Sequence, residues 1–300
     1  MVEFYRIDTL VNEASSFWVS LLVTVIGTLL GFLGAFLIYN RADRKEVYKE
    51  NKAKEDRYKD RLKYLSQLVD DSLLMLSNQL DNFEELANDI SQYPTEQHKL
   101  KIKASDNLKR LQNMDTEEVF HAYHLVIPES DEKIKNYKNI YNCIDFLYLR
   151  LEQAIDSADK TVNFTYRDQM FIKEKIDYLS SVIYLKINDL NKDPSKDPDF
   201  YSFLIHSHRE YMKLVEGSSN IGNYEKDFLV PFGEDLRNRF LNHSFFNELI
   251  DLTSKALVRF NHMKVNASLF SSELKGLRKE MKDSYERLAL INDEIKIHNK

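Results

Sequence analysis

The sequence predicts an all-α protein with one N-terminal transmembrane helix, a helical stalk and a cytoplasmic multi-helix bundle whose first and last helices are long and amphipathic. Three observations support this class. A long apolar segment near the N-terminus carries no charge, only four of the seven glycines lie beyond residue 40, and apolar residues recur there at spacings of three and four. We divide the chain into a short extracytoplasmic N-terminus (1–16), a transmembrane helix (17–39), a charged stalk (40–61) and a helical bundle domain (62–300).

The transmembrane prediction depends on the length of the apolar segment. From Phe17 to Tyr39 it has 23 residues, which gives a helix of roughly 34 Å at about 1.5 Å per residue. This length crosses the ~30 Å hydrocarbon layer of a bilayer. A secretory signal peptide is the alternative, but its apolar region is shorter and follows basic residues rather than preceding them.

The charges on either side of this segment predict its orientation. Upstream, Arg6 is the only basic residue among three acids. Downstream, six basic residues follow within 15 positions: Arg41, Arg44, Lys45, Lys49, Lys52 and Lys54. Because basic flanks stay in the cytoplasm, we expect the N-terminus outside and the C-terminal domain inside the cell. Richness in Lys, Asn, Ile and Tyr favours a bacterial source, and hence the bacterial inner membrane.

Small residues line one face of the apolar segment. Gly27 and Gly31 form a GxxxG step, and Gly34 and Ala35 extend it. In lipid, such a face lets two helix backbones approach closely and gain dispersion contacts. We therefore expect either a homo-oligomer associated through this face or a monomeric anchor.

Charged residues of both signs dominate positions 41–61, which predicts a solvated helical stalk. An apolar stripe then begins: Tyr58, Leu62, Leu65, Val69, Leu73, Leu76, Leu80, Phe83, Ala87 and Ile90. A second stripe closes the chain: Phe270, Leu274, Leu277, Met281, Leu288, Ile291 and Ile295. The two helices are expected to pair antiparallel, either as a coiled coil or as part of a bundle.

Between these stripes the sequence predicts helices near 97–113, 115–126, 131–158, 166–191, 199–216 and 234–262. Loops are marked by Pro128, by residues 191–198 with two prolines, and by residues 217–222 with two glycines. One side of the 131–158 segment carries a predicted core stripe: Ile134, Tyr137, Tyr141, Ile144, Tyr148, Leu151 and Ile155.

Composition excludes several functional classes. The net charge of −6 lacks the strong positive field of a general nucleic-acid binder. Cys143 is the only cysteine, so no intramolecular disulfide can form. No Walker loop, dinucleotide-binding GxGxxG, CxxC or HExxH motif occurs, and we expect no cofactor.

One short pattern bears on catalysis. Arg237 is followed by Asn238 and, six positions after the arginine, by His243. This resembles the Arg-x(4–6)-His motif of HEPN-type ribonucleases, which are dimeric helical bundles that cleave RNA without a metal. The resemblance would assign proton transfer to His243 and phosphate stabilisation to Arg237, in keeping with imidazole and guanidinium chemistry. The alternative is a surface arginine and a structural histidine.

A second pattern concerns metals. Glu117, His121 and His124 lie at i, i+4 and i+7, on one face of a predicted helix. Three such groups have the chemistry of a metal site with an open position, but a polar helix face is the simpler interpretation.

These patterns leave three functional hypotheses. The leading one is a membrane-anchored cytoplasmic module that binds a protein partner or signal. The second is a membrane-anchored HEPN-like endoribonuclease acting on RNA in phage defence or toxicity. The third is an oligomerising effector that perturbs the bilayer.

Overall fold

The computed structural model describes residues 3–102, 106–217 and 220–299, with side chains in the first helix described from residue 18 onward. In the predicted extracytoplasmic segment (1–16), the first two residues and all side chains thus lie outside the described part, as does the side chain of Phe17. The described residues form helices and no strands. In order these are α1 (Glu3–Gln92), α2 (Asp106–Gln112), α3 (Thr116–Val126), α4 (Lys133–Leu190), η1 (Pro194–Lys196), α5 (Pro198–Glu216), α6 (Ile221–Tyr224), the π-helical turn η2 (Glu225–Leu229), α7 (Val230–Arg239) and α8 (Phe246–His298).

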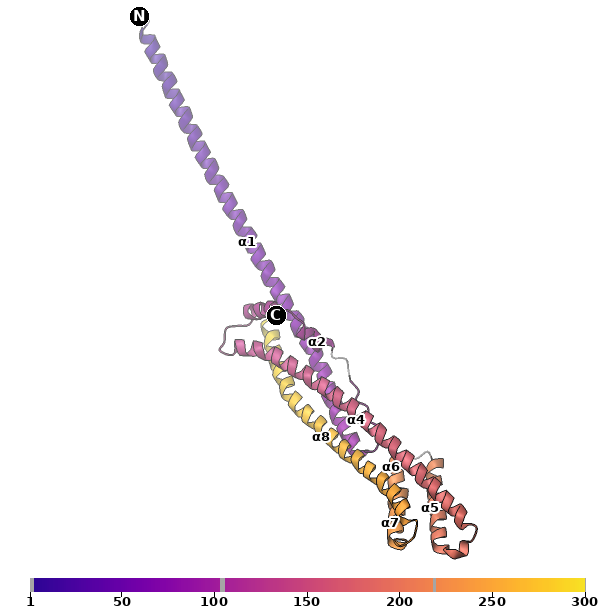
Figure 1. Ribbon diagram of the computed structural model, residues 1–300. Coiled ribbons are helices and arrows are strands. Elements are labelled where there is room, and N and C mark those ends of the chain that lie inside the picture. The colour runs from indigo at the N-terminus through magenta and orange to yellow at the C-terminus, as the bar shows by residue number, and fades with distance from the viewer. Residues whose placement is uncertain (1–2, 103–105, 218–219, 300) are drawn as a thin grey trace.

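Helix α1 is one continuous helix of 90 residues that joins the apolar segment, the stalk and the bundle. Its first half projects from the rest of the molecule (Figure 1). Side chains of the stalk are exposed from residue 41 to residue 57, Tyr58 and Arg61 are partly buried, and the buried core begins at Leu62. The predicted stripe from Leu62 to Ile90 is buried throughout, which confirms this core face.

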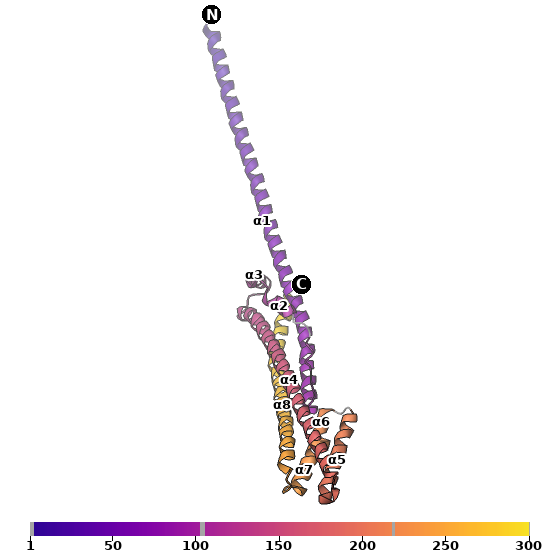
Figure 2. The ribbon, with the colours of Figure 1, turned by 45° about the vertical axis from the view of Figure 1, so that its right-hand side comes forward.

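Three long helices build the body of the molecule, with α8 antiparallel to both α1 and α4 (Figures 1 and 2). Along α1, contacts run from Asn299 Nδ2 to Lys59 O at one end to Ser271 Oγ to Ala87 O at the other. Along α4, they run from Asn136 with Glu294 to Lys186 with Glu248. The predicted antiparallel pairing of the first and last helices is therefore confirmed, within a bundle that also includes α4.

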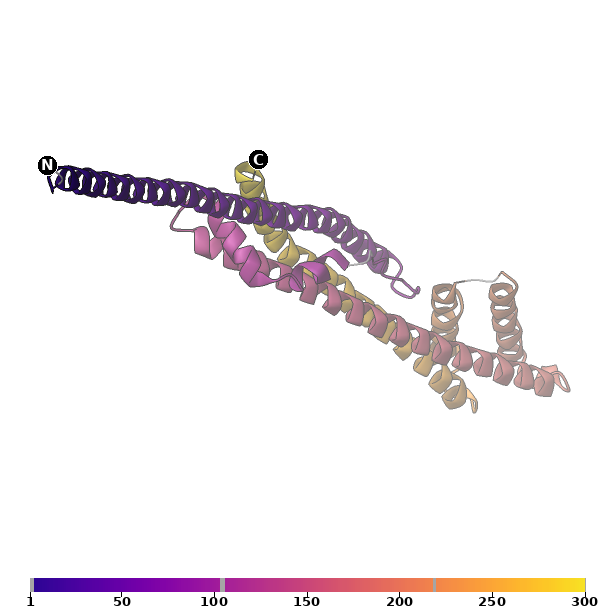
Figure 3. The same cartoon turned by 90° about the horizontal axis from the view of Figure 1, so that it is seen from above.

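Two hydrophobic clusters share α4 and α8. The first cluster combines the apolar stripes of α1 and α8 with the N-terminal half of α4 and with α2 and α3. It includes Phe83, Tyr123 and Leu147. The second lies beyond the end of α1, where α5, η2 and α7 cover the remaining part of the α4–α8 pair. Figure 3 shows these orange helices at the end of the molecule farthest from the N-terminus.

Several predicted helix boundaries are wrong. The segments 131–158 and 166–191 form a single helix, α4. The segment 234–262 is broken at residues 240–245, where a turn separates α7 from α8. In the predicted 97–113 helix, only Asp106–Gln112 is helical among the described residues. Ile134, predicted as core, is exposed because it lies off the buried face of α4, which includes its neighbour Lys133 and continues through Tyr137 and Ile140.

Candidate functional site

His243 lies in the turn between α7 and α8, where it contacts the start of α5. Its Nε2 is 2.9 Å from Asp197 Oδ2, and the backbone N–H of Phe245 donates to its Nδ1 at 3.3 Å. Since Nδ1 accepts a hydrogen bond, Nε2 carries the proton and donates to the carboxylate. The ring also stacks on Phe200 with centroids 3.7 Å apart. Both ring nitrogens are therefore occupied by contacts within the protein.

Arg237 lies on α7, six residues earlier, with an exposed side chain. Within the described part of the chain its side chain makes no ion pair and no hydrogen bond, and so none with His243. Asp197, the partner of His243, also accepts from the Phe200 N–H and so caps the N-terminus of α5. The arrangement joins two turns in the second cluster, and Arg237 does not take part in it.

The predicted metal candidates lie on α3. Glu117 and His121 face each other across 3.9 Å at the surface. His124 instead packs against Phe120, with ring centroids 4.3 Å apart, and its Nε2 is buried with no hydrogen-bond partner in the described ranges. Among the described residues no group of three His, Cys, Asp or Glu side chains has the geometry to hold a metal ion.

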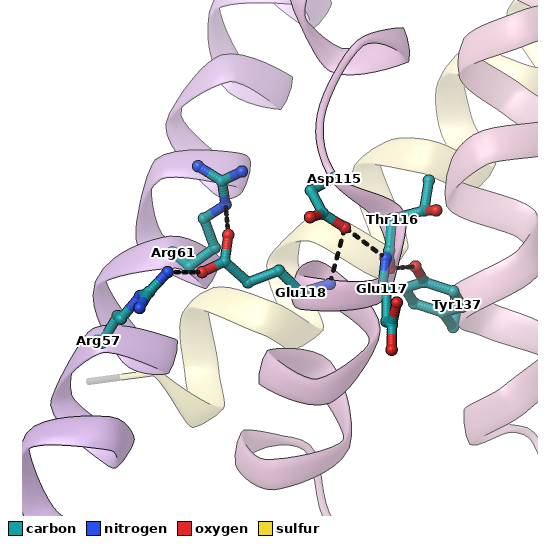
Figure 4. A network of polar contacts seen from close by, with 7 residues as sticks. All are labelled: Arg57, Arg61, Asp115, Thr116, Glu117, Glu118 and Tyr137. Carbon is teal, nitrogen blue, oxygen red and sulfur yellow. Dashed lines mark hydrogen bonds and ion pairs between the residues drawn. The ribbon is translucent and has the colours of Figure 1, made fainter. Parts of the chain in front are cut away.

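The same helix is fixed to the stalk by a neighbouring polar network (Figure 4). Glu118 accepts from Arg57 at 2.6 Å and pairs with Arg61 at 3.2 Å. Asp115 caps α3 by accepting from the N–H groups of Glu117 and Glu118, and Tyr137 donates to the carbonyl of Thr116. These contacts dock α3 on both α1 and α4.

The small residues of the apolar segment face outward on α1. A Cβ added at Gly27, Gly31 or Gly34 would meet nothing within 4 Å, and Ala35 is exposed. On the same face, the Thr24 and Thr28 hydroxyls donate to the carbonyls of Ser20 and Thr24 at 2.8 and 2.7 Å. Their polar groups are thus satisfied inside the helix, as an apolar solvent requires.

A groove that the sequence analysis did not predict lies at the distal end. Its floor is the α4 face bearing Tyr166, Met170, Lys173 and Asp177, at spacings of four, three and four residues. Three adjoining hollows share Lys173, and the largest is about 600 Å³. The walls come from α5, α6 and the segment after α1, through Tyr211, Val215, Ile221, Tyr224, Glu96 and Gln97. We call this feature the distal groove.

Hydrogen bonds between distant segments hold the walls in place. Gln169 donates to the carbonyl of Thr95 at 2.8 Å and accepts from Gln97 at 2.9 Å. Asn220 donates to Glu96, and a Cβ added at Gly222 would lie 2.8 Å from Thr95 Oγ1. Close approach of α6 to this segment thus requires glycine at position 222.

Tyr211 and Asp177 connect the wall to the floor. The Tyr211 hydroxyl donates to Asp177 Oδ1 at 3.0 Å. Burial raises the pKa of Tyr211 to about 12, and its hydrogen bond to the Asp177 carboxylate adds to the shift. Burial likewise raises the pKa of Tyr224. Both tyrosines are therefore neutral near pH 7 and present hydroxyl groups to the groove.

This combination of aromatic and aliphatic surface with a few polar groups is typical of a ligand-binding or protein-binding surface. The sequence signal available was the i, i+4, i+7, i+11 pattern on α4, but the walls come from segments far apart in the chain. Compared with known proteins, the chain matches no protein-family model, no curated protein and no solved structure.

Proposed function

We propose that this chain is a single-pass membrane protein whose helical domain binds a protein partner in the cytoplasm through the distal groove. The observation that carries the proposal is the continuity of α1. Its N-terminal half leaves a long apolar segment uncovered, and its C-terminal half is the first core helix of the bundle. Anchor and binding domain thereby form one continuous element.

The exposed apolar surface supports the membrane part. From Trp18 to Tyr39, the large apolar side chains are 45% exposed or more, and Phe32 reaches 74%. A soluble monomer rarely exposes so long an apolar surface to water. In a bilayer, each Leu, Ile, Phe or Val near the centre of the helix contributes roughly 0.3–0.6 kcal/mol in favour of insertion. Insertion into a membrane would thus cover the apolar side chains of residues 18–39, which the rest of the chain leaves exposed.

The flanking charges support the orientation, with the N-terminus outside and the domain in the cytoplasm of a bacterial cell. The uncovered Gly27–Gly31 face supports self-association of two copies in the membrane. Either as a monomer or as a dimer, the stalk would hold the bundle away from the lipid surface, since its side chains are exposed from residue 41 to residue 57.

Site-specific photo-crosslinking in membranes of the source cell tests the proposal. A benzoylphenylalanine at Met170, 52% exposed in the distal groove, should give a discrete adduct with one protein. The matched control is Leu149, 62% exposed on the same helix but outside the groove, which should give none. Identical products from both positions, or release of the chain from membranes by carbonate, would contradict the proposal.

A further inference from the structure

Helix α3 lies at the end of the bundle from which the stalk emerges (Figure 2). It is an amphipathic helix of 11 residues that packs on α1 and α4, and its buried side chains are Val119, Ala122 and Tyr123. A helix this short has little stability of its own, since isolated helices below about 12–15 residues are marginal in water. Its position therefore depends on the contacts that it makes with its neighbours.

Polar contacts hold α3 at three places along its length. Tyr137 of α4 donates to the first carbonyl of α3, and Lys133 of α4 donates to a carbonyl in its last turn at 2.9 Å. Between these two places, Glu118 pairs with Arg57 and Arg61 on α1 (Figure 4). The Arg57 side chain is 75% exposed, so water competes for this ion pair and the pair contributes little to docking.

Two buried polar atoms on α3 oppose its docking. Tyr123 is fully buried, and its hydroxyl has no hydrogen-bond partner among the described residues. The Nε2 atom of His124 is likewise buried with no such partner in the described part of the chain. Each atom loses its hydrogen bonds to water when α3 docks and gains none from the protein, which is unfavourable. Undocking of α3 would relieve this penalty.

Undocking would also uncover aromatic surface on both neighbouring helices. The ring centroids of His121 and Tyr58 of α1 lie 6.4 Å apart. Those of Phe120 and Tyr123 lie 5.1 and 5.6 Å from that of Tyr137 on α4. Helix α8 contacts α1 and α4 independently of α3. Release of α3 therefore does not require the three long helices to separate.

We propose that α3 is a latch, which opens as a unit at a lower free energy than the rest of the bundle and uncovers the aromatic surface of Tyr58 and Tyr137. Its contacts with Arg57 and Arg61 place one point of attachment on the helix that also carries the apolar segment. Segments that move in switching are drawn from the parts of a protein that open most easily.

Native-state hydrogen exchange of the full chain in nanodiscs, measured by mass spectrometry at several low urea concentrations, tests the latch. After correction for intrinsic rates, residues 119–126 should exchange at least about 100-fold faster than residues 270–281 of α8, which lie in the first hydrophobic cluster. Exchange in α3 should depend weakly on urea because undocking exposes little surface, whereas exchange in α8 should rise steeply.

Two tyrosine variants should change the exchange of residues 119–126 in opposite directions. Tyr123→Phe removes the unpaired buried hydroxyl and should slow exchange by about tenfold, because the docked helix no longer carries its desolvation penalty. Tyr137→Phe is the matched control. It removes a hydroxyl from a second buried tyrosine, but this hydroxyl donates to Thr116, so exchange should become faster by about tenfold.

Equal exchange rates and equal urea dependence in residues 119–126 and 270–281 would overturn the latch, since α3 would then open only with the whole bundle. Unchanged or faster exchange in Tyr123→Phe would overturn it as well, because the buried hydroxyl would then not oppose docking. Neither result bears on the membrane anchor or on the distal groove, so the proposed function would stand.

Discussion

At the scale of single residues, the imidazole of His243 joins the α7–α8 turn to the first turn of α5 through Asp197 and Phe200. The sequence shows that a histidine follows an arginine at a short spacing. It does not reveal that a carboxylate 46 residues away accepts a hydrogen bond from the imidazole ring. Roles of this kind depend on tertiary contacts, so the motif alone could not distinguish a catalytic from a structural histidine.

Replacing His243 with Ala removes the hydrogen bond to Asp197 and the stacking on Phe200. We expect a loss of about 1–3 kcal/mol in the free energy of unfolding. Arg237→Ala should stay within about 0.5 kcal/mol because its side chain is exposed and unpaired in the described part of the chain. Urea denaturation followed by circular dichroism measures both. Equal stability of both variants, combined with loss of RNA cleavage in both, would instead favour a ribonuclease.

Tyr123 predicts a response to alkaline pH. Its side chain is fully buried, its hydroxyl has no hydrogen-bond partner among the residues that the structure describes, and burial raises its pKa to about 12. Between pH 10 and about 12 the unfolded chain loses this proton while the folded chain keeps it, so stability falls as pH rises. Tyr123→Phe should reduce this loss by about 1–3 kcal/mol without destabilising the chain at pH 7. Urea denaturation at pH 8 and pH 11 measures the loss of unfolding free energy in the original chain and in the variant. An identical loss in the two would contradict a raised pKa for Tyr123.

At the scale of elements, the long stripes of α1 and α8 were predictable because every third or fourth residue meets the same core. The sequence did not predict that α4 is one continuous helix. Residues 159–165 include Thr161, Val162 and Asn163, whose helix propensity is low. Packing against α8 on both sides, through Ser157 with Glu273 and Asp168 with Arg259, outweighs these small differences. The local sequence does not contain this information.

The ion pairs between α3 and the stalk converge on one carboxylate, that of Glu118 (Figure 4). Glu118→Gln weakens the contacts with Arg57 and Arg61, at a cost of about 0.5–1 kcal/mol. We expect faster hydrogen exchange across residues 116–126, measured by mass spectrometry. Glu117→Gln is the control, since that side chain is 86% exposed and pairs only weakly with His121. Unchanged exchange for Glu118→Gln would show that α3 is held by its apolar face alone.

The apolar half of α1 predicts association in the membrane. Gly31→Ile fills the face at which a second helix would approach, and a Cβ at this position meets no atom of the described residues within 4 Å. Crosslinking of the full chain in vesicles should lose its dimer band in this variant, while Leu29→Ile, on the opposite face of the helix, should retain it. A dimer that survives Gly31→Ile would mean that another face, or none of this helix, mediates association.

At the scale of the whole molecule, the order of apolar segment, charged stalk and bundle follows from composition along the chain, because hydropathy and charge are local properties. The distal groove does not follow from them. Its floor and walls meet only when α4, α5, α6 and the segment after α1 are packed together. Tyr166, Met170 and Lys173 look like ordinary surface residues of a helix until the walls are in place.

The central claim is that α1 crosses a membrane with the bundle on the cytoplasmic side. The most direct test is labelling of intact cells with a membrane-impermeant maleimide, after Cys143→Ala removes the only native cysteine. Asp8→Cys should react in intact cells, and Tyr48→Cys, on the exposed stalk, should react only after the membrane is opened. Reaction of Tyr48→Cys in intact cells would contradict the account.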